Sequence, residues 1–386
     1  MQTKATGGNG GIVWANGEEW KNVRRFSLQA MRDFGVGKTS IEEKILEEAQ
    51  NIIEDIENNT GSEITTVKDM MTKASCNVIH SIIFGFRYKH DDPTLRNLLS
   101  SMDDIFTGPG VLSASGLFPV LNLLFRKTFK RRMDGFQELK KYVDSQILQH
   151  RVTYDPDNVR DFVDIYIKAE MEGSDSKSLF EQGTLFNTIL DLFAAGTDTT
   201  STTLDWSILY MIQYPHVQLQ CQEEILKVIG PGRMIRSTDR RSLTYIEATL
   251  MEIMRLANTA ILALPHSSIC ETTINGYTVP KNTIVAANLV SAHFDETIWT
   301  NPKEFNPNRF LDANSQIINK EYLMPFSTGP RICPGESLAK SELFLIFANL
   351  LQRFTFSKVD GDILSFDGIV GITRTAPPYR VMAKQR

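Results

Sequence analysis

The chain has 386 residues, of which 42% are hydrophobic, and its formal net charge at pH 7 is −5. This size and composition are typical of a globular protein with a large buried core, and the acidic balance gives no reason to expect a partner nucleic acid. The four cysteines lie far apart in the chain, which excludes a disulfide scaffold and a zinc site built on close cysteine pairs.

Helical periodicity dominates the first two-thirds of the chain, and strands come late. An Asn-Gly pair predicts a hairpin over 272–279, and the apolar run 283–289 predicts a further strand. A proline-rich stretch then precedes one last apolar helix, from about Gly335 to Leu351. The earlier helices are predicted over 41–57, 67–84, 134–150, 159–172, 178–214, 217–229 and 244–256.

The whole chain, 1–386, is therefore expected to form one mainly helical domain with small β-sheets, of the α+β class. No apolar stretch reaches the roughly 18 residues expected of a membrane-spanning helix. The dense basic run 126–132 favours a solvated helix face over a membrane-surface or partner contact.

One cysteine, Cys333, lies in the loop 326–335, which proline and glycine bracket directly before the last helix. Backbone N–H groups at a helix start, and the positive end of its dipole, favour a thiolate over a thiol. Taken alone, such a cysteine is better interpreted as a buried structural residue. The ten-residue string as a whole, Phe-Ser-Thr-Gly-Pro-Arg-Ile-Cys-Pro-Gly, changes that interpretation, because it resembles the heme-thiolate loop of the cytochrome P450 superfamily.

The resemblance implies a cytochrome P450 fold in which Cys333 is the axial ligand of the iron of heme b, iron protoporphyrin IX. It implies that Arg331 pairs with a heme propionate. A thiolate ligand favours cleavage of the O–O bond, which is what an oxygenase needs.

A second match lies within the long helix predicted over 178–214, where Ala195 to Thr203 hold a glycine and six hydroxyl residues. Such residues are poor helix formers that can bond back to helix carbonyls, so a polar face or a kink would explain them. By resemblance this stretch is the oxygen-binding groove, with Asp198 and Thr199 as an acid–alcohol pair. The role implied for the pair is catalytic delivery of protons.

Three other matches concern support and cofactor binding. Glu252 and Arg255 form a Glu-x-x-Arg motif, and Arg309 supplies its third member, in a structural role. Trp20 and Arg24 stand four residues apart on one helical face, and by resemblance they bind heme propionates together with His266.

The resemblance runs from Gly10 to Val381 and is strongest to the eukaryotic microsomal enzymes of family 2. The membrane-anchor helix and the first helices and strands of that family are expected before Gly10, so the sequence looks truncated at its front end. The family places such enzymes on the cytoplasmic face of the endoplasmic reticulum membrane.

The leading hypothesis is a monooxygenase that inserts one oxygen atom of dioxygen into a lipophilic substrate, a fatty acid, a steroid or a xenobiotic. The chain shows no dinucleotide or flavin motif, so electrons are expected from NADPH through a flavoprotein reductase, with Lys21, Arg25 and Lys340 as contacts. Two alternatives stay open at this stage: an isomerase or dehydratase of lipid peroxides with the same fold, and an inactive heme-binding fragment.

Overall fold

The computed structural model describes residues 10–34, 39–58, 63–64, 67–106, 126–173 and 183–386. Its helices are α2 (Gly17–Asp33), α3 (Thr39–Glu57), α4 (Val67–Ile83), α5 (Pro93–Phe106), α7 (Arg126–Thr153), α8 (Phe162–Met171), α9 (Thr184–Gln213), α10 (Pro215–Val228), α11 (Thr244–Ala257), α12 (Leu289–His293) and α13 (Glu336–Arg353). The same described ranges also hold short 3-10 helices: η3 (Ser237–Arg241), η4 (Pro307–Phe310) and η5 (Lys320–Tyr322).

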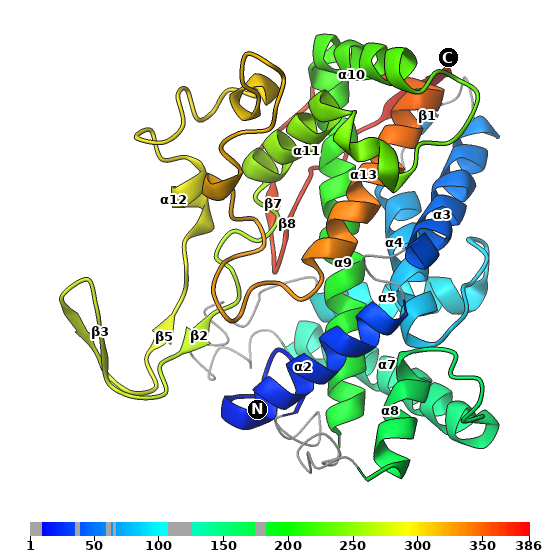
Figure 1. Cartoon of the computed structure of the whole chain (residues 1–386), viewed down its shortest axis with the longest axis vertical. Coiled ribbons are helices and arrows are strands. Elements are labelled where there is room, and N and C mark those ends of the chain that lie inside the picture. Colours follow the sequence, from blue (N-terminus) through cyan, green and yellow to red (C-terminus); the bar gives the residue numbers. More distant parts are fainter. Residues whose placement is uncertain (1–9, 35–38, 59–62, 65–66, 107–125, 174–182) are drawn as a thin grey trace.

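The long helix α9 runs through the middle of the molecule, with α13 beside it and α3 and α4 on one flank (Figure 1). Between Leu204 and Ile212 every side chain of α9 is buried, which is the pattern of a helix enclosed on all sides. Gly196 lets α4 approach α9 closely, since a Cβ there would lie 3.2 Å from Cγ1 of Ile79. The core that results draws on residues from Ile12 to Ala383.

The strands are short and pair antiparallel. One sheet has the order β1-β9-β6, in which Ile64 pairs with Val381 and Phe356 pairs with Ala383. The other strands form the pairs β2-β5, β3-β4 and β7-β8. Their bounds are β1 (Glu63–Ile64), β2 (His266–Ser267), β3 (Thr272–Ile274), β4 (Tyr277–Val279), β5 (Ile284–Val285), β6 (Phe354–Lys358), β7 (Ile369–Val370), β8 (Arg374–Thr375) and β9 (Val381–Gln385).

The predicted mainly helical α+β class is confirmed, and so are the hairpin β3-β4 and the last helix α13. Three details of the prediction were wrong. Helix α5 was missed, α7 begins at Arg126 and not at Asp134, and the run 283–289 forms strand only over Ile284–Val285 because α12 begins at Leu289. The predicted helix start at Ser178 lies outside the described residues.

None of the helices in the described ranges is both long and apolar enough to span a membrane. The segment 258–335, between α11 and α13, is mostly loops and short strands and lies to one side of the helices (Figure 1). This segment ends in the loop that carries Cys333, so the cysteine loop is held where the irregular side of the molecule meets the helical side.

Candidate functional site

The cysteine loop closes on itself before α13 begins. The backbone N–H of Cys333 donates to the carbonyl of Phe326 at 3.0 Å, and that of Ile332 donates to the carbonyl of Gly329 at 3.0 Å. Ser327 and Gly329 hold left-handed backbone conformations, with φ of 63° and 80°, which a tight turn requires. The loop therefore fixes Cys333 by backbone bonds, two residues before the cap of the helix.

The surroundings of the Cys333 thiol act on its ionisation in two directions. Burial raises the pKa of the thiol, while the N–H groups of Gly335 and Glu336 and the charge of Arg24 lower it in part. Gly335 caps α13 and Glu336 is its first residue, so these donors are the free N–H groups of the helix start. A cation near the sulfur would complete the stabilisation of the thiolate.

Three side chains from two distant parts of the chain converge beside this loop. Arg24, on α2, donates to the carbonyl of Ile332 at 2.6 Å, and its guanidinium lies 5.7 Å from the centre of the Trp20 ring. The guanidinium of Arg331 lies 4.0 Å from the centre of the same ring. Burial lowers the pKa of both arginines, and for Arg331 the charge of Arg24 adds to the effect.

This group of donors fits the propionates of a heme. In the described part of the chain, no carboxylate pairs with Arg24 or Arg331, although the two cations are close enough to affect each other. The indole N–H of Trp20 is buried and has no hydrogen-bond partner among the residues that the structure describes. Two cations and a free N–H donor beside a cysteine suit a ligand that carries carboxylates at its edge and a metal at its centre.

The structure does not bring His266 into this group. His266 is exposed in β2, where its backbone pairs with Val285, and its ring has no hydrogen-bond partner among the described residues. β2 and β5 lie at one side of the molecule, with the β3-β4 hairpin projecting beyond them (Figure 1). The role of His266 thus stays a prediction.

Asp198 and Thr199 lie one after the other on α9, both partly buried. The Thr199 hydroxyl donates to the carbonyl of Ala195 at 2.7 Å, as expected of a hydroxyl that bonds back to its own helix. Oδ2 of Asp198 accepts the hydroxyl of Thr373 at 2.7 Å. α9 runs through this stretch as one continuous helix.

The β7-β8 hairpin is attached to α9 near this acid–alcohol pair. Trp206 donates from its indole nitrogen to the carbonyl of Arg374 at 3.0 Å, next to the Asp198–Thr373 bond. Val370, at the end of β7, is 67% exposed, and Leu262, in the loop after α11, is 42% exposed. Phe193, on α9, is buried in the core, where its ring lies 6.1 Å from that of His80.

Glu252 holds two arginines in a buried cluster, as the Glu-x-x-Arg motif predicts. Arg255 binds both of its oxygens, at 2.8 and 2.9 Å, and Arg309 binds Oε1 at 2.8 Å. The cluster continues toward the cysteine loop, because Arg255 donates to the carbonyl of His293 at 2.7 Å and the His293 ring accepts the N–H of Met324 at 3.0 Å. Burial lowers the pKa of His293 to about 4, which keeps its ring neutral and able to accept.

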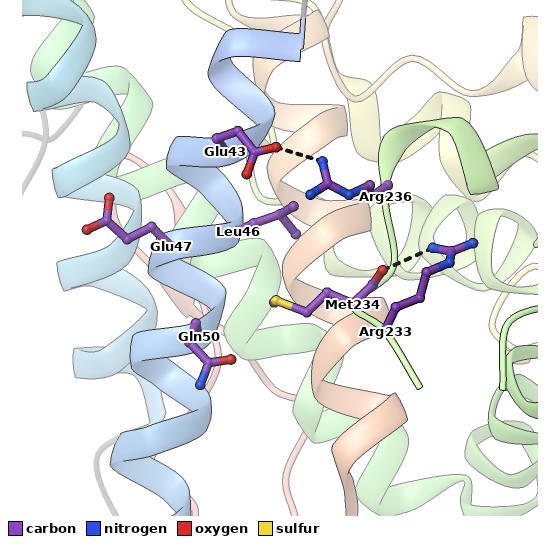
Figure 2. A pocket seen from close by; sticks show the side chains of 7 residues that line it. All are labelled: Glu43, Leu46, Glu47, Gln50, Arg233, Met234 and Arg236. Atoms are coloured by element: carbon purple, nitrogen blue, oxygen red, sulfur yellow. Dashed lines mark hydrogen bonds and ion pairs between the residues drawn. The ribbon is translucent and has the colours of Figure 1, made fainter. Parts of the chain in front are cut away.

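A surface hollow of about 420 Å³ lies elsewhere, between α3 and the segment before η3 (Figure 2). Its two cations are already paired, Arg233 with Asp239 and Arg236 with Glu43, both at 2.6 Å. Both arginines of the hollow are therefore already neutralised by carboxylates, and we assign the hollow no ligand.

Sequence reasoning missed three residues that the structure places at or near the site: Thr373, His293 and Asp191. Each is a single polar residue whose partner lies far away in the sequence. No local spacing in the sequence indicates such a contact. These residues could have been identified only by predicting which distant segments pack against each other.

Comparison with known proteins agrees with this geometry. The family model described as Cytochrome P450 matches residues 2–383. The chain is 40% identical over 378 residues to Cytochrome P450 2B4 of Oryctolagus cuniculus, an alignment that covers 96% of this chain and 76% of that protein. It is 37% identical over 377 residues to Cytochrome P450 2J2 of Homo sapiens, covering 97% and 74%. The chain therefore belongs to the cytochrome P450 family, and it is a heme-thiolate monooxygenase.

Proposed function

We propose that Cys333 ligates the iron of a heme b whose propionates Trp20, Arg24 and Arg331 hold, with His266 as a further donor by family resemblance. The observation that carries the proposal is that two guanidinium groups and one indole N–H converge on the cysteine loop, and within the described ranges no carboxylate binds either guanidinium and no acceptor binds the indole. A heme bound there supplies the activation of dioxygen and the transfer of one oxygen atom to the substrate.

Asp198 and Thr199 move protons in this proposal. The Thr199 hydroxyl would give up its bond to the Ala195 carbonyl and donate a proton into the site, and Asp198 would take up a proton from solvent water and pass it to Thr199, so that both groups return to their starting state. Thr373 holds one oxygen of the Asp198 carboxylate, which leaves the other free for this exchange. A carboxylate fixed in this way keeps one orientation through the reaction.

The substrate that we propose is lipophilic, a fatty acid, a steroid or a xenobiotic. The side chains that support this are apolar, and they are exposed on the loop after α11 and on the hairpin tied to Asp198: Leu262, Ile369, Val370 and Ile372. Electrons come from NADPH through a flavoprotein reductase, which binds Lys21, Arg25 and Lys340. Lys21 and Arg25 are exposed on α2, the helix that carries Trp20 and Arg24.

We further propose that residues 1–386 form one catalytic domain, which the extent of its core supports. By resemblance to the family 2 enzymes, this domain acts on the cytoplasmic face of the endoplasmic reticulum membrane.

The spectrum of the reduced, carbon-monoxide-bound protein tests the ligand. The wild type should give the band of thiolate ligation, and Cys333→Ala should lose it. Cys270→Ala is the matched control, because Cys270 is an exposed free cysteine, and it should keep the band. An unchanged spectrum in Cys333→Ala, or a band of histidine ligation in the wild type, would remove Cys333 as the ligand.

A further inference from the structure

His90 lies in the segment 84–92, which connects α4 to α5, and both nitrogens of its ring face carboxylates of α3. Nε2 lies 2.8 Å from Oε2 of Glu48, and Nδ1 lies 3.0 Å from Oδ2 of Asp55. The two acids stand seven residues apart on α3, which puts them on one face of the helix, two turns from each other. The side chain of His90 is only 11% exposed, so the ring bridges these two turns largely out of contact with solvent.

The ring can satisfy both carboxylates in only one of its protonation states. A neutral imidazole has one N–H and one lone pair, whereas the protonated ring donates from both nitrogens. The neutral ring therefore turns a lone pair toward one of the two acids, and two acceptors then face each other. Burial by itself would lower the pKa of His90, but the hydrogen bonds and charges of Glu48 and Asp55 raise it more, and the net shift is upward.

No neighbouring charge in the described ranges takes over the part of His90. The charges that act on its ring are those of Glu48 and Asp55. Arg87, in the same segment, donates to Oε1 of Glu48 at 2.5 Å and not to the oxygen that faces His90. Glu342, on α13, lies near enough for the charge of Glu48 to act on it, and burial raises the pKa of Glu342 well above its ordinary value, which favours the neutral acid there.

The earlier part of the segment is anchored in a way that does not depend on pH. The side-chain amide of Asn77, on α4, accepts the N–H of Tyr88 at 3.1 Å and donates to the carbonyl of Tyr88 at 2.9 Å. Beyond this anchor, His90 supplies the contact with α3. We propose that His90 is a proton-dependent clamp, which fastens residues 89–92 and the start of α5 to α3 when its ring is charged and releases them when the ring is neutral.

The release should reach the first turn of α5, which begins at Pro93. Asp92 caps this turn, since its Oδ1 accepts the N–H of Thr94 at 2.7 Å and its carbonyl accepts the N–H of Arg96 at 3.2 Å. Because the clamped state raises the pKa of His90, the clamp is complete below the ordinary value of about 6.5 and is lost as the pH rises through the folded-state value.

Hydrogen–deuterium exchange in the heme-loaded protein between pH 6 and pH 9, corrected for the intrinsic pH dependence of exchange, tests the clamp. The N–H groups to follow are those of Asp92, Thr94 and Arg96, each of which is hydrogen-bonded. In the wild type, their protection should fall by about tenfold as the pH rises, the effect of one lost hydrogen bond to a charged group. The N–H of Tyr88, held by Asn77, should keep its protection.

Two variants separate the clamp from other effects of pH. His90→Gln cannot donate to both acids in any state, so its protection should be low at both ends of the pH range. In Asp55→Asn, the amide can accept from the protonated ring and donate to the neutral one, so protection should be retained at both ends. A fall of wild-type size in either variant would overturn the inference, and so would flat protection in the wild type.

Two other histidines serve as controls. His216, on α10, is exposed, and His216→Gln should behave as the wild type. His150 lies close to the start of the segment, with its ring centre 6.1 Å from that of Phe84, and it faces Asp161. The fall in protection should persist in His150→Gln, because the clamp is made by a different ring. If the fall vanished in His150→Gln, the proton would belong to His150 and the assignment to His90 would be wrong.

Discussion

The carboxylate of Asp198 accepts the hydroxyl of Thr373 at 2.7 Å, across 175 residues of sequence. This bond ties the acid of the central helix to the turn of the β7-β8 hairpin. Thr373 is buried, so neither partner can easily exchange this bond for one with water. The orientation of Asp198 is thus set by the C-terminal part of the chain.

Thr373→Val should disorder the Asp198 carboxylate and lower the fraction of NADPH electrons that reach product, with more peroxide released. Thr373→Ser, which keeps the hydroxyl, should restore the coupling. The loss of one hydrogen bond costs about 1 kcal/mol of stability, so the fold should survive. Product and peroxide are measured per NADPH consumed, and equal coupling in the Val and Ser variants would contradict the prediction.

Thr199→Ala should lower the share of NADPH electrons that reach product more strongly than Thr373→Val. It removes the hydroxyl that donates the proton, whereas Thr373→Val removes a hydroxyl that only orients Asp198. We expect product per NADPH to fall by about a hundredfold, the lower end of the range typical of a lost general acid. Thr199→Ser should retain most of the coupling. If Thr199→Ala oxidised substrate with full coupling, the relay through Thr199 would be wrong.

Glu252→Gln should destabilise the protein by about 3–5 kcal/mol, because it leaves two buried guanidinium groups without their counter-charge. Both Arg255 and Arg309 depend on this carboxylate, and the side chains of Glu252 and Arg255 have no exposed area. Urea unfolding gives the free energy, and Soret absorbance gives the heme content, which should fall because the cluster supports the cysteine loop through His293.

The control for Glu252 is Glu138→Gln. Glu138 pairs with Lys141 at the same three-residue spacing, but both side chains are more than half exposed, so the free energy of unfolding should hardly change. A similar loss of unfolding free energy in the two variants would show that the buried cluster stabilises the protein no more than an exposed ion pair does.

His150 should make the stability of the protein depend on pH. Its Nε2 lies 2.9 Å from Asp161 and its Nδ1 lies 2.7 Å from the carbonyl of Gln146, so both nitrogens can donate only when the ring is protonated. Burial lowers the pKa of His150, but the hydrogen bond and charge of Asp161 raise it more, and the net shift is upward.

Because the folded state raises this pKa, the stabilisation is complete below the ordinary value of about 6.5 and is lost as the pH rises through the folded-state value. Unfolding free energies measured from pH 6 to pH 9 should show this fall, and His150→Gln should remove it. His216→Gln, at an exposed histidine of α10, should leave the fall unchanged. A slope that survives in His150→Gln would contradict the assignment.

Arg25→Glu should slow reductase-supported turnover by about tenfold at low salt, since a charge at the rim of an interface acts mainly on the rate of association. Turnover driven by added peroxide needs no reductase and should stay unchanged. Lys127→Glu, at an exposed cation of α7, is the control for charge alone. If Arg25→Glu lowered both kinds of turnover equally, its effect would not be on reductase binding.

Several site residues and several helices could be predicted from the spacing of neighbouring residues in the sequence. The string around Cys333, the Asp198–Thr199 pair and the Glu252–Arg255 pair can be read from a few neighbouring residues, because a turn or one helical face sets their geometry. The same holds for the helices α3, α4, α10 and α11, whose apolar periodicity covers their full length. Helix α5 was missed and α7 was predicted too short.

The long-range contacts were decided by tertiary packing alone. Arg24 reaches the carbonyl of Ile332 across 308 residues, and Asp191 reaches Ile12 across 179. Such pairs depend on how several helices settle against one another, which no short window of sequence contains. The sequence by itself determined which chemistry the chain carries, in Cys333, Asp198 and Thr199. The packing of α2, α9 and the β7-β8 hairpin decided which side chains surround and orient that chemistry, because each is fixed by an element remote in the chain.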